Sequence, residues 1–281
     1  MKARIITIAA MAAVIALTSC NKDESNTVPS KYITINAGVG TLTRATATAF
    51  EIGDKISVYS WTGSNTAVQT PLAVDNSINT YDGAKWTAAP QMLWKDNTTV
   101  HYFLSVYPQK AITNFTADNY VTTPDLLVAT VLGEGRTAID GIVPLMFDHV
   151  MAKLVVNLTF RDEFGGTPAV ESVTVDAKPG ATVNYLTKIA TADGTGASVD
   201  LGATTANITY EGVVSPQTVN VIQIKIAGKT YTYNNATGFA LVDGKIQTVN
   251  LIVGRDAITL GSVAVNDWTT GDIINGGEAQ E

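Results

Sequence analysis

The chain has 281 residues, a formal net charge of −7 and a sequence pI near 4.8. Its acidic balance and its lack of a Lys/Arg run argue against nucleic acid as a partner, because neutralising phosphates needs clustered cations. Hydrophobic residues make up 46% and charged residues 15%, a composition that supports a packed core and argues against a disordered chain. The length allows one large β domain or two of ordinary size.

The N-terminus has the layout of an export signal. The positive stretch "MKAR" precedes an apolar run, Ile5 to Leu17, that is shorter than the ~20 residues a spanning helix needs. The next residues, "LTSC", resemble a bacterial lipobox, which implies thioether lipidation of Cys20 and cleavage just before it. Cys20 is the only cysteine, so no disulfide framework is expected. We predict a lipoprotein signal peptide over residues 1–19; the alternative is an ordinary signal peptide with an unrelated cysteine.

Beyond a polar tether, apolar residues recur with the period of two that is typical of strands. In "KYITINA" this spacing places Ile33, Ile35 and Ala37 on one face. The other segments of this kind are "DKISVYSW" (54–61), "TTVHYFLSVYP" (98–108), "AKLVVNLTF" (152–160), "VESVTVDA" (170–177), "VNVIQIKIAGKTYTYNN" (219–235), "GKIQTVNLIV" (244–253) and "AITLGSVAV" (257–265). Turn clusters separate them, and no segment shows a long helical stripe. The sequence therefore predicts an all-β protein built as sandwiches, with a hairpin turning at Gly228-Lys229.

The stretch "DEFGGTPAV", residues 162–170, interrupts two strong strands with Gly-Gly, Pro and charge. Such a break is typical of a domain boundary. We predict an N-terminal sandwich over residues 45–165 and a C-terminal sandwich over residues 166–281.

Few residues are suited to catalysis. The only histidines, His101 and His149, are not part of a nucleophile motif, and we expect each to be a hydrogen-bonded strand or edge residue. The sequence offers no four-ligand spacing for zinc, so no metal and no cofactor are predicted. A pair of carboxylates for glycoside hydrolysis stays an open alternative, because the sequence does not give their separation in space. Four aromatic residues fit either a sandwich core or a sugar-stacking surface; these are Trp61, Trp86, Trp94 and Tyr107. We predict that the protein is not an enzyme.

The order of several segments resembles the fimbrillin family, the lipoprotein-derived subunits of type V pili in Gram-negative gut and oral bacteria. These segments are "FEIGDKISVYSW", "YDGAKW", "HYFLSVYP", "LMFDHVMAKLVVNL", "LVDGKIQTVNLIV" and a terminal "VAVNDW". The resemblance covers nearly the whole mature chain. It implies two transthyretin-like β-sandwich domains in tandem, a removable N-terminal segment and assembly by strand exchange.

A single arginine, Arg44, lies in the small, uncharged run "TLTRATATA" between two expected strands. A protease that cuts between Arg44 and Ala45 would remove residues 20–44, which carry both the lipid anchor and the first strand. A sandwich that loses an edge strand exposes unpaired backbone groups and recruits a strand from another chain. We predict processing at this bond; the alternative is that Arg44 is a solvated loop residue.

The expected donor is residues 257–268, near the other end of the chain. Its apolar positions are Ile258, Leu260, Val263, Val265 and Trp268, and Gly261 predicts a bulge or a bend. The alternative is that this stretch is the last intramolecular strand.

The predicted function is a structural subunit of a cell-surface fimbrium. The protein is exported as an outer-membrane lipoprotein, matured after Arg44 and polymerised by donor-strand exchange into an extracellular fimbrium that supports adhesion. Its expected partners are other pilus subunits and a host or bacterial surface ligand. The alternative is a non-polymerising outer-membrane lipoprotein that binds glycan or a host protein. The choice among stalk, tip and anchor subunit stays open.

Overall fold

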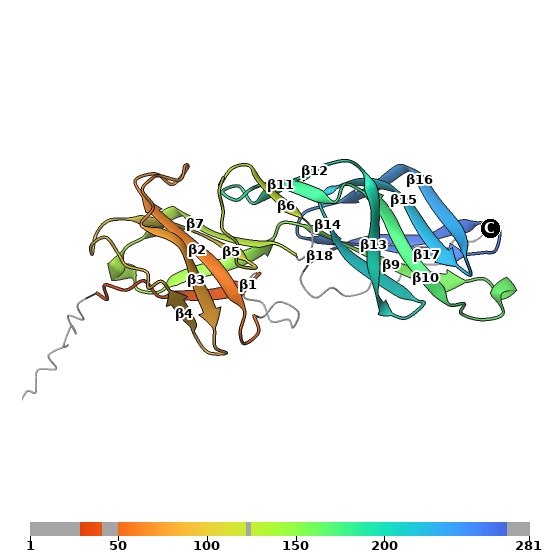
Figure 1. The fold of residues 1–281 in the computed structure, drawn as a ribbon, viewed down its shortest axis with the longest axis horizontal. Coiled ribbons are helices and arrows are strands. Elements are labelled where there is room, and N and C mark those ends of the chain that lie inside the picture. The colour runs from red at the N-terminus through yellow and green to blue at the C-terminus, as the bar shows by residue number, and fades with distance from the viewer. Residues whose placement is uncertain (1–28, 41–49, 122–124, 269–281) are drawn as a thin grey trace, which may run out of the picture.

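A computed structural model describes residues 29–40, 50–121 and 125–268. Their regular structure is almost entirely strand, which confirms the all-β class, and the strands form three sheets along an elongated molecule (Figure 1). Two short 3₁₀ helices, η1 (Ala138–Asp140) and η2 (Asp162–Phe164), lie between strands.

The first sheet has seven strands and curls into a half-barrel. Its members are β1 (Ile35–Val39), β2 (Lys55–Thr62), β3 (Val74–Tyr81), β4 (Trp86–Ala89), β5 (His101–Tyr107), β7 (Leu127–Arg136) and β8 (Val143–His149). Their spatial order is β1-β8-β7-β5-β2-β3-β4. The hollow of the half-barrel holds one buried cluster, to which Ile56, Phe103 and Leu145 contribute.

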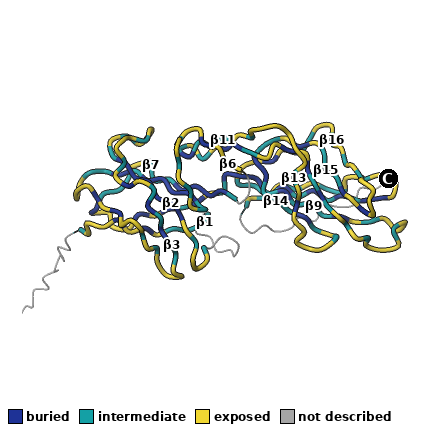
Figure 2. Tube along the Cα trace, viewed as in Figure 1, coloured by how far each residue is buried: buried dark blue, intermediate teal, exposed yellow. Residues whose placement is uncertain are grey.

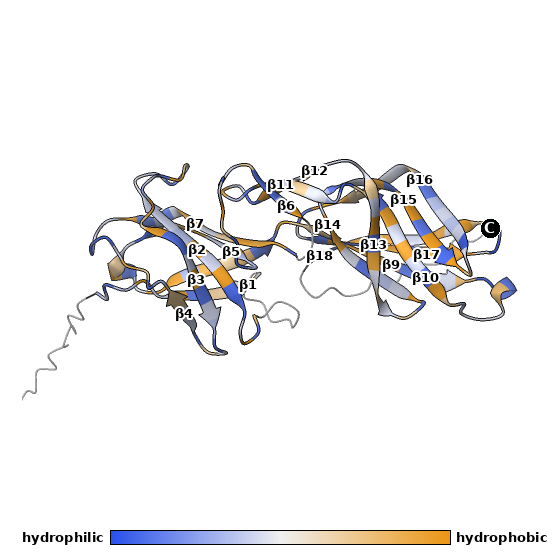
Figure 3. Cartoon of the chain, viewed as in Figure 1, coloured by the Kyte–Doolittle hydropathy of each residue, from blue (hydrophilic) through white to orange (hydrophobic). Residues whose placement is uncertain are grey.

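The second sheet has eight strands and forms a nearly closed barrel around a separate core. Its members are β9 (Ala152–Phe160), β10 (Val170–Ala177), β13 (Ala197–Thr205), β14 (Thr209–Val214), β15 (Gln217–Ile226), β16 (Lys229–Leu241), β17 (Lys245–Val253) and β18 (Ile258–Asp267). Their order is β16-β15-β10-β13-β14-β9-β17-β18. Hydropathy alternates along β10 and β15 as the period of two predicts (Figure 3).

The third sheet joins the two halves of the chain. It consists of β12 (Ile189–Asp193), β11 (Gly180–Asn184) and β6 (Asp118–Val121), so a hairpin from the C-terminal half pairs with a strand from the N-terminal half. Val183 and Tyr185 from this hairpin region share a buried cluster with Trp61 and Leu104 of the first sheet. The C-terminal half therefore covers the outer face of the first sheet.

This cover explains a pattern that the sequence did not predict. The alternation in "DKISVYSW" predicts one buried and one polar face, yet β2 is buried on both faces (Figure 2). Ile56 and Val58 face the hollow of the half-barrel, whereas Tyr59 and Trp61 face the third sheet. The central strand β5 is buried on both faces in the same way.

The predicted boundary at residues 162–170 does not coincide with the change of sheet. Strand β9, which falls inside the predicted N-terminal unit, pairs with β14 and β17 of the second sheet. The change falls at Val150 and Met151, between β8 and β9, and both residues are buried. Residues 162–170 connect β9 to β10 within the second sheet, so their turn signals mark a connection inside one sheet.

The predicted hairpin is present, with its turn one residue earlier than expected. Ile226 pairs with Lys229, so the turn residues are Ala227 and Gly228. Both have positive φ, 48° and 76°. That combination belongs to a type I′ turn, whose twist matches the strands it joins.

Gly135, in β7, provides a test of backbone fit. Its φ is +67°, and a Cβ placed on it would lie 2.5 Å from Val100 Cγ1 and 2.7 Å from the His101 carbonyl oxygen. We expect Gly135→Ala to lower the free energy of unfolding by about 2–4 kcal/mol, from left-handed strain and overpacking. Urea denaturation measures the change. Gly133→Ala is the matched control, since a Cβ there meets nothing within 4 Å; an equal loss in both variants would contradict this explanation.

Candidate functional site

The N-terminal segment, residues 31–40, packs into the core of the first sheet. Ile33 and Ile35 are only 1% and 8% exposed, and Ala37 and Val39 pack against the same buried cluster. The predicted inward face, Ile33, Ile35 and Ala37, is thereby confirmed. The segment fills a space in the half-barrel rather than lying on its surface.

One edge of this segment pairs with β8. The pairing is parallel and runs from Ile35 opposite Val143 to Val39 opposite Phe147. The backbone N–H of Gly40 extends it by donating to the Phe147 carbonyl oxygen at 2.8 Å.

The other edge of the segment meets residues 92–94. The Ile33 N–H donates to the Met92 carbonyl, and the Trp94 N–H donates to the Lys31 carbonyl, each at 3.1 Å. The segment thus meets backbone on both of its edges, with residues 31–33 at residues 92–94 and residues 34–40 at β8, and its loss would open a groove along both. The sequence prediction missed this second edge, because Met92, Leu93 and Trp94 are all apolar and show no period of two.

The predicted lipidation and processing residues, Cys20, Arg44 and Ala45, lie outside the described residues. Across residues 29–40, 50–121 and 125–268, no helix is both long and apolar enough to cross a membrane.

The predicted donor strand is β18, and here it lies on its own domain. It pairs antiparallel with β17 at one edge of the second sheet. Leu260 and Val263 pair with Leu251 and Val249, whose side chains are fully buried on the core side. Paired residues of an antiparallel ladder face the same side, so Leu260, Val263 and Val265 face the core side as well. They nevertheless remain 37%, 42% and 54% exposed. The strand therefore places an apolar row where its own domain covers it incompletely.

Gly261 marks a bulge in this strand. Asn250 pairs with Ser262 and Leu251 pairs with Leu260, which leaves Gly261 as the extra residue. A Cβ there would lie 3.2 Å from the Asn250 carbonyl oxygen.

Trp268 holds the end of β18 at the junction of the two large sheets. Its backbone N–H donates to the Gly244 carbonyl at 2.9 Å. Its indole ring stacks on His149, with ring centroids 4.1 Å apart and planes 4° apart. His149 Nδ1 in turn hydrogen-bonds to the Asp125 carboxylate. The sequence prediction gave His149 no such role, because its two partners are remote in the chain.

His101 is fully buried, and the backbone satisfies its ring. The Lys95 N–H donates to Nε2 at 3.3 Å, so Nδ1 carries the proton that faces the Thr99 carbonyl at 3.0 Å. Burial lowers the pKa of His101 from its usual value. Backbone contacts on both nitrogens leave neither free to act as a base.

The pKa of His101 predicts how stability depends on pH. In the unfolded chain the His101 ring becomes protonated near pH 6.5, whereas in the folded protein it becomes protonated only at a lower pH. We expect the free energy of unfolding to fall as the pH decreases from 7.5 to 5.5, by at most about 1.4 kcal/mol per pH unit for one proton. Urea denaturation across this range measures the slope. His101→Gln should flatten the slope in part; an unchanged slope would contradict the assignment to His101.

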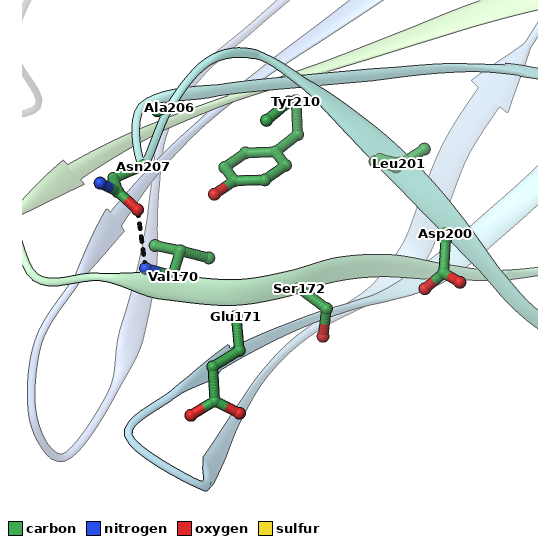
Figure 4. Close-up of a pocket in the computed structure, with 9 residues that line it drawn as sticks. Val170, Glu171, Ser172, Asp200, Leu201, Ala206, Asn207 and Tyr210 are labelled. Carbon is green, nitrogen blue, oxygen red and sulfur yellow. Dashed lines mark hydrogen bonds between the residues drawn. The ribbon is translucent and has the colours of Figure 1, made fainter.

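A hollow of about 420 Å³ lies beside β10 in the second sheet (Figure 4). The Tyr210 ring projects into it, while Glu171 points away from that ring. The Glu171 carboxylate accepts the Gly228 N–H at 2.6 Å and pairs with Lys225 at 3.1 Å. Those bonds lower its pKa and brace the hairpin turn. The contacts of Glu171 with Gly228 and Lys225 therefore support the fold, and they do not pair Glu171 with a second carboxylate.

The aromatic residues that could have stacked on sugars serve the core. Trp61 and Trp94 are buried, and Trp86 and Tyr107 both make T-shaped ring contacts with Phe50. In the part of the chain that the structure describes, no three metal-ligating side chains gather.

Comparison with known proteins addresses family and fold. A search among curated proteins found no match. A solved structure from Bacteroides uniformis, assigned provisionally to cell adhesion, is 21% identical, covers 85% of this chain and 100% of its own, and has a TM-score of 0.66. A second such structure, from Bacteroides ovatus, is 16% identical with coverages of 86% and 99% and the same TM-score. A fimbrial protein from Bacteroides vulgatus is 15% identical, with coverages of 84% and 99% and a TM-score of 0.50.

These likenesses show a shared fold along almost the whole length of the solved chains. The sequence itself matches the model of the Fimbrillin-like family over residues 43–268. That match covers well over half of the chain, and it begins just after the N-terminal segment that fills the half-barrel. The chain therefore belongs to the Fimbrillin-like family.

Proposed function

We propose that this protein is a structural subunit of a cell-surface pilus, in which the N-terminal segment is exchanged for the C-terminal strand of another subunit. Family membership and the fold shared with fimbrial and adhesion proteins support a pilus-subunit or adhesion role at the cell surface. The observation that carries the proposal is the seat of residues 31–40, which meet residues 92–94 along their first part and β8 along the rest.

The acceptor is the groove that this segment would leave. Ile33 and Ile35 are buried there, and burial of each such side chain stabilises the fold by about 1.5–3 kcal/mol. An emptied groove would present apolar walls together with unpaired N–H and C=O groups. A second strand with apolar residues at alternate positions restores both kinds of contact.

The donor is β18. Its core-facing row is much more exposed than Ile33 and Ile35 are in their groove. Transfer of the row to such a groove on another subunit increases its burial, which favours exchange. Trp268 supplies a large aromatic anchor at the end of the strand.

Maturation in this scheme involves Cys20 and the bond between Arg44 and Ala45. Lipidation at Cys20 anchors the precursor in the outer membrane, since several acyl chains together give stable attachment. Cleavage between Arg44 and Ala45 then removes residues 20–44, together with the filling segment. The released subunit joins an extracellular fimbrium, and its role is structural rather than catalytic.

Treatment of the purified protein that begins at Cys20 and is not yet cleaved after Arg44 with an arginine-specific protease tests this scheme. We expect a ladder of multimers on a native gel, and we expect Arg44→Ala to abolish it. Arg161→Ala and Arg255→Ala are matched controls that should ladder normally. Cleaved protein that stays monomeric at high concentration with its C-terminal strand intact would overturn the proposal, as would ladders from Arg44→Ala.

The full pairing of β18 with β17 favours a second candidate, a surface lipoprotein that never polymerises. In that case β18 stays on its own domain, and the protein binds a glycan or a host protein. The same gel separates the two candidates, because this one predicts a cleaved but monomeric product.

A further inference from the structure

Strand β8 contacts both the N-terminal segment and the end of the C-terminal strand. Its residues Phe147–His149 pair with β7, whereas its residues Val143–Met146 have β1 as their only ladder partner among the described residues. Removal of β1 would therefore leave the first part of β8 without a neighbour on either edge. The strand would be held in the sheet only at its last three residues.

The last of these residues, His149, forms the seat of Trp268, by which we mean the ring on which the indole stacks. The Phe147 carbonyl accepts the final hydrogen bond of the N-terminal segment, from Gly40, and His149 lies two positions further along the same strand. The His149 ring stacks on Trp268, and its Nδ1 atom hydrogen-bonds to the Asp125 carboxylate. The last contacts of the N-terminal segment, at Phe147, and the stack on Trp268, at His149, thus lie two residues apart on β8.

We propose that β8 couples the two ends of the chain, so that loss of the N-terminal segment loosens the seat of Trp268 and frees the end of β18. The purpose of this coupling rests on the proposed function, because it would make a subunit release its donor strand only after its own groove has opened. The coupling itself is a property of the monomer and needs no polymer to be measured.

The end of β18 is suited to such control, because few side-chain contacts add to its backbone ladder with β17 and to the Trp268 N–H bond with Gly244. Asp267 forms an exposed ion pair with Lys245, and exposed pairs contribute little. Val265 is more than half exposed. The stack on His149 is therefore the main side-chain contact at this end, and its loss should let the strand fray from Trp268 backward.

Hydrogen exchange on the protein that begins at Cys20 and is not cleaved after Arg44 tests the coupling from the N-terminal side. Ile35→Ala weakens the seat of β1, and we expect amides of residues 264–268 to exchange about tenfold faster. Ile56→Ala is the matched control: it empties the same core from β2, which does not pair with β8. Equal exchange of residues 264–268 in wild type and Ile35→Ala would overturn the proposal, and so would equal acceleration in both variants.

Coupling between two sites is reciprocal, so the reverse experiment has a defined result. Trp268→Ala should accelerate exchange of the amides of residues 36–40, and Trp268→Phe, which keeps an aromatic face, should restore most of the protection. If residues 36–40 exchange alike in all three proteins, β8 does not couple the ends. A protein that shows this coupling and yet never ladders would contradict the proposed function and leave the coupling intact.

Discussion

Val263→Asp is expected to abolish laddering of the cleaved protein while leaving the monomer folded. In the monomer Val263 is 42% exposed, so an aspartate at this position keeps much of its hydration, and we expect a loss of about 1 kcal/mol or less in the free energy of unfolding. In the groove of another subunit the same position would meet apolar walls. An unpaired carboxylate buried there is strongly unfavourable.

The measurement is a native ladder beside a urea denaturation curve for the same variant. Thr259→Asp is the matched control, because Thr259 lies on the opposite face of β18 and is exposed. It should ladder like the wild-type protein. Normal laddering of Val263→Asp would show that the core-facing row of β18 does not enter a groove, and unfolding of the monomer would show that the row is essential to its own domain.

Asp118→Ala is expected to lower the free energy of unfolding by about 2–4 kcal/mol. Asp118 is buried in the third sheet, where it accepts the Tyr185 hydroxyl at 2.8 Å and forms an ion pair with Lys110. Removal of the carboxylate leaves a buried hydroxyl and a partly buried ammonium group without their partner. The Tyr185 hydroxyl has a raised pKa, mainly from burial, so it cannot ionise to pair with the lysine at neutral pH.

Urea denaturation of Asp118→Ala, Tyr185→Phe and the double variant forms a thermodynamic cycle. We expect a coupling energy of about 1 kcal/mol or more between the two positions. Tyr185→Phe alone should cost less, since the phenyl ring keeps the packing of the third sheet. Additive losses would contradict a direct bond between the two side chains.

The sequence predicted the local features of this fold well. Alternation identified β1, β2, β5, β9, β10 and β15–β18 and the inward face of Ile33 and Ile35, and Gly261 indicated the bulge in β18. These features depend on neighbouring residues and on the two-residue period of a strand. Alternation missed β7, β8 and the hairpin of β11 and β12. The change of sheet at Val150 and Met151 escaped prediction because both residues are buried and apolar, without the turn residues that usually mark a boundary.

The missed parts of the candidate site depend on contacts between remote segments. The parallel pairing of β1 with β8 leaves no local pattern, since either strand alone is compatible with many partners. The stack of Trp268 on His149, with Asp125 behind it, unites three distant positions. The burial of β2 on both faces depends on a hairpin from the other half of the chain. The strands β1, β2 and β18 were predictable from their own residues, whereas their partners were not, and β8 was itself absent from the predicted strands.

The third sheet has a mechanical consequence. In a fibre that joins the groove of the first sheet to a strand from the second, tension must pass from one large sheet to the other. The direct connection between them is the short link between β8 and β9. The ladder of β6 with β11 bridges the same gap, from Gly180 opposite Val121 to Val183 opposite Asp118, and shares the load with that link. A pull on the fibre would therefore have to shear a hydrogen-bonded sheet, braced by the Asp118 network, before the two halves of a subunit could separate.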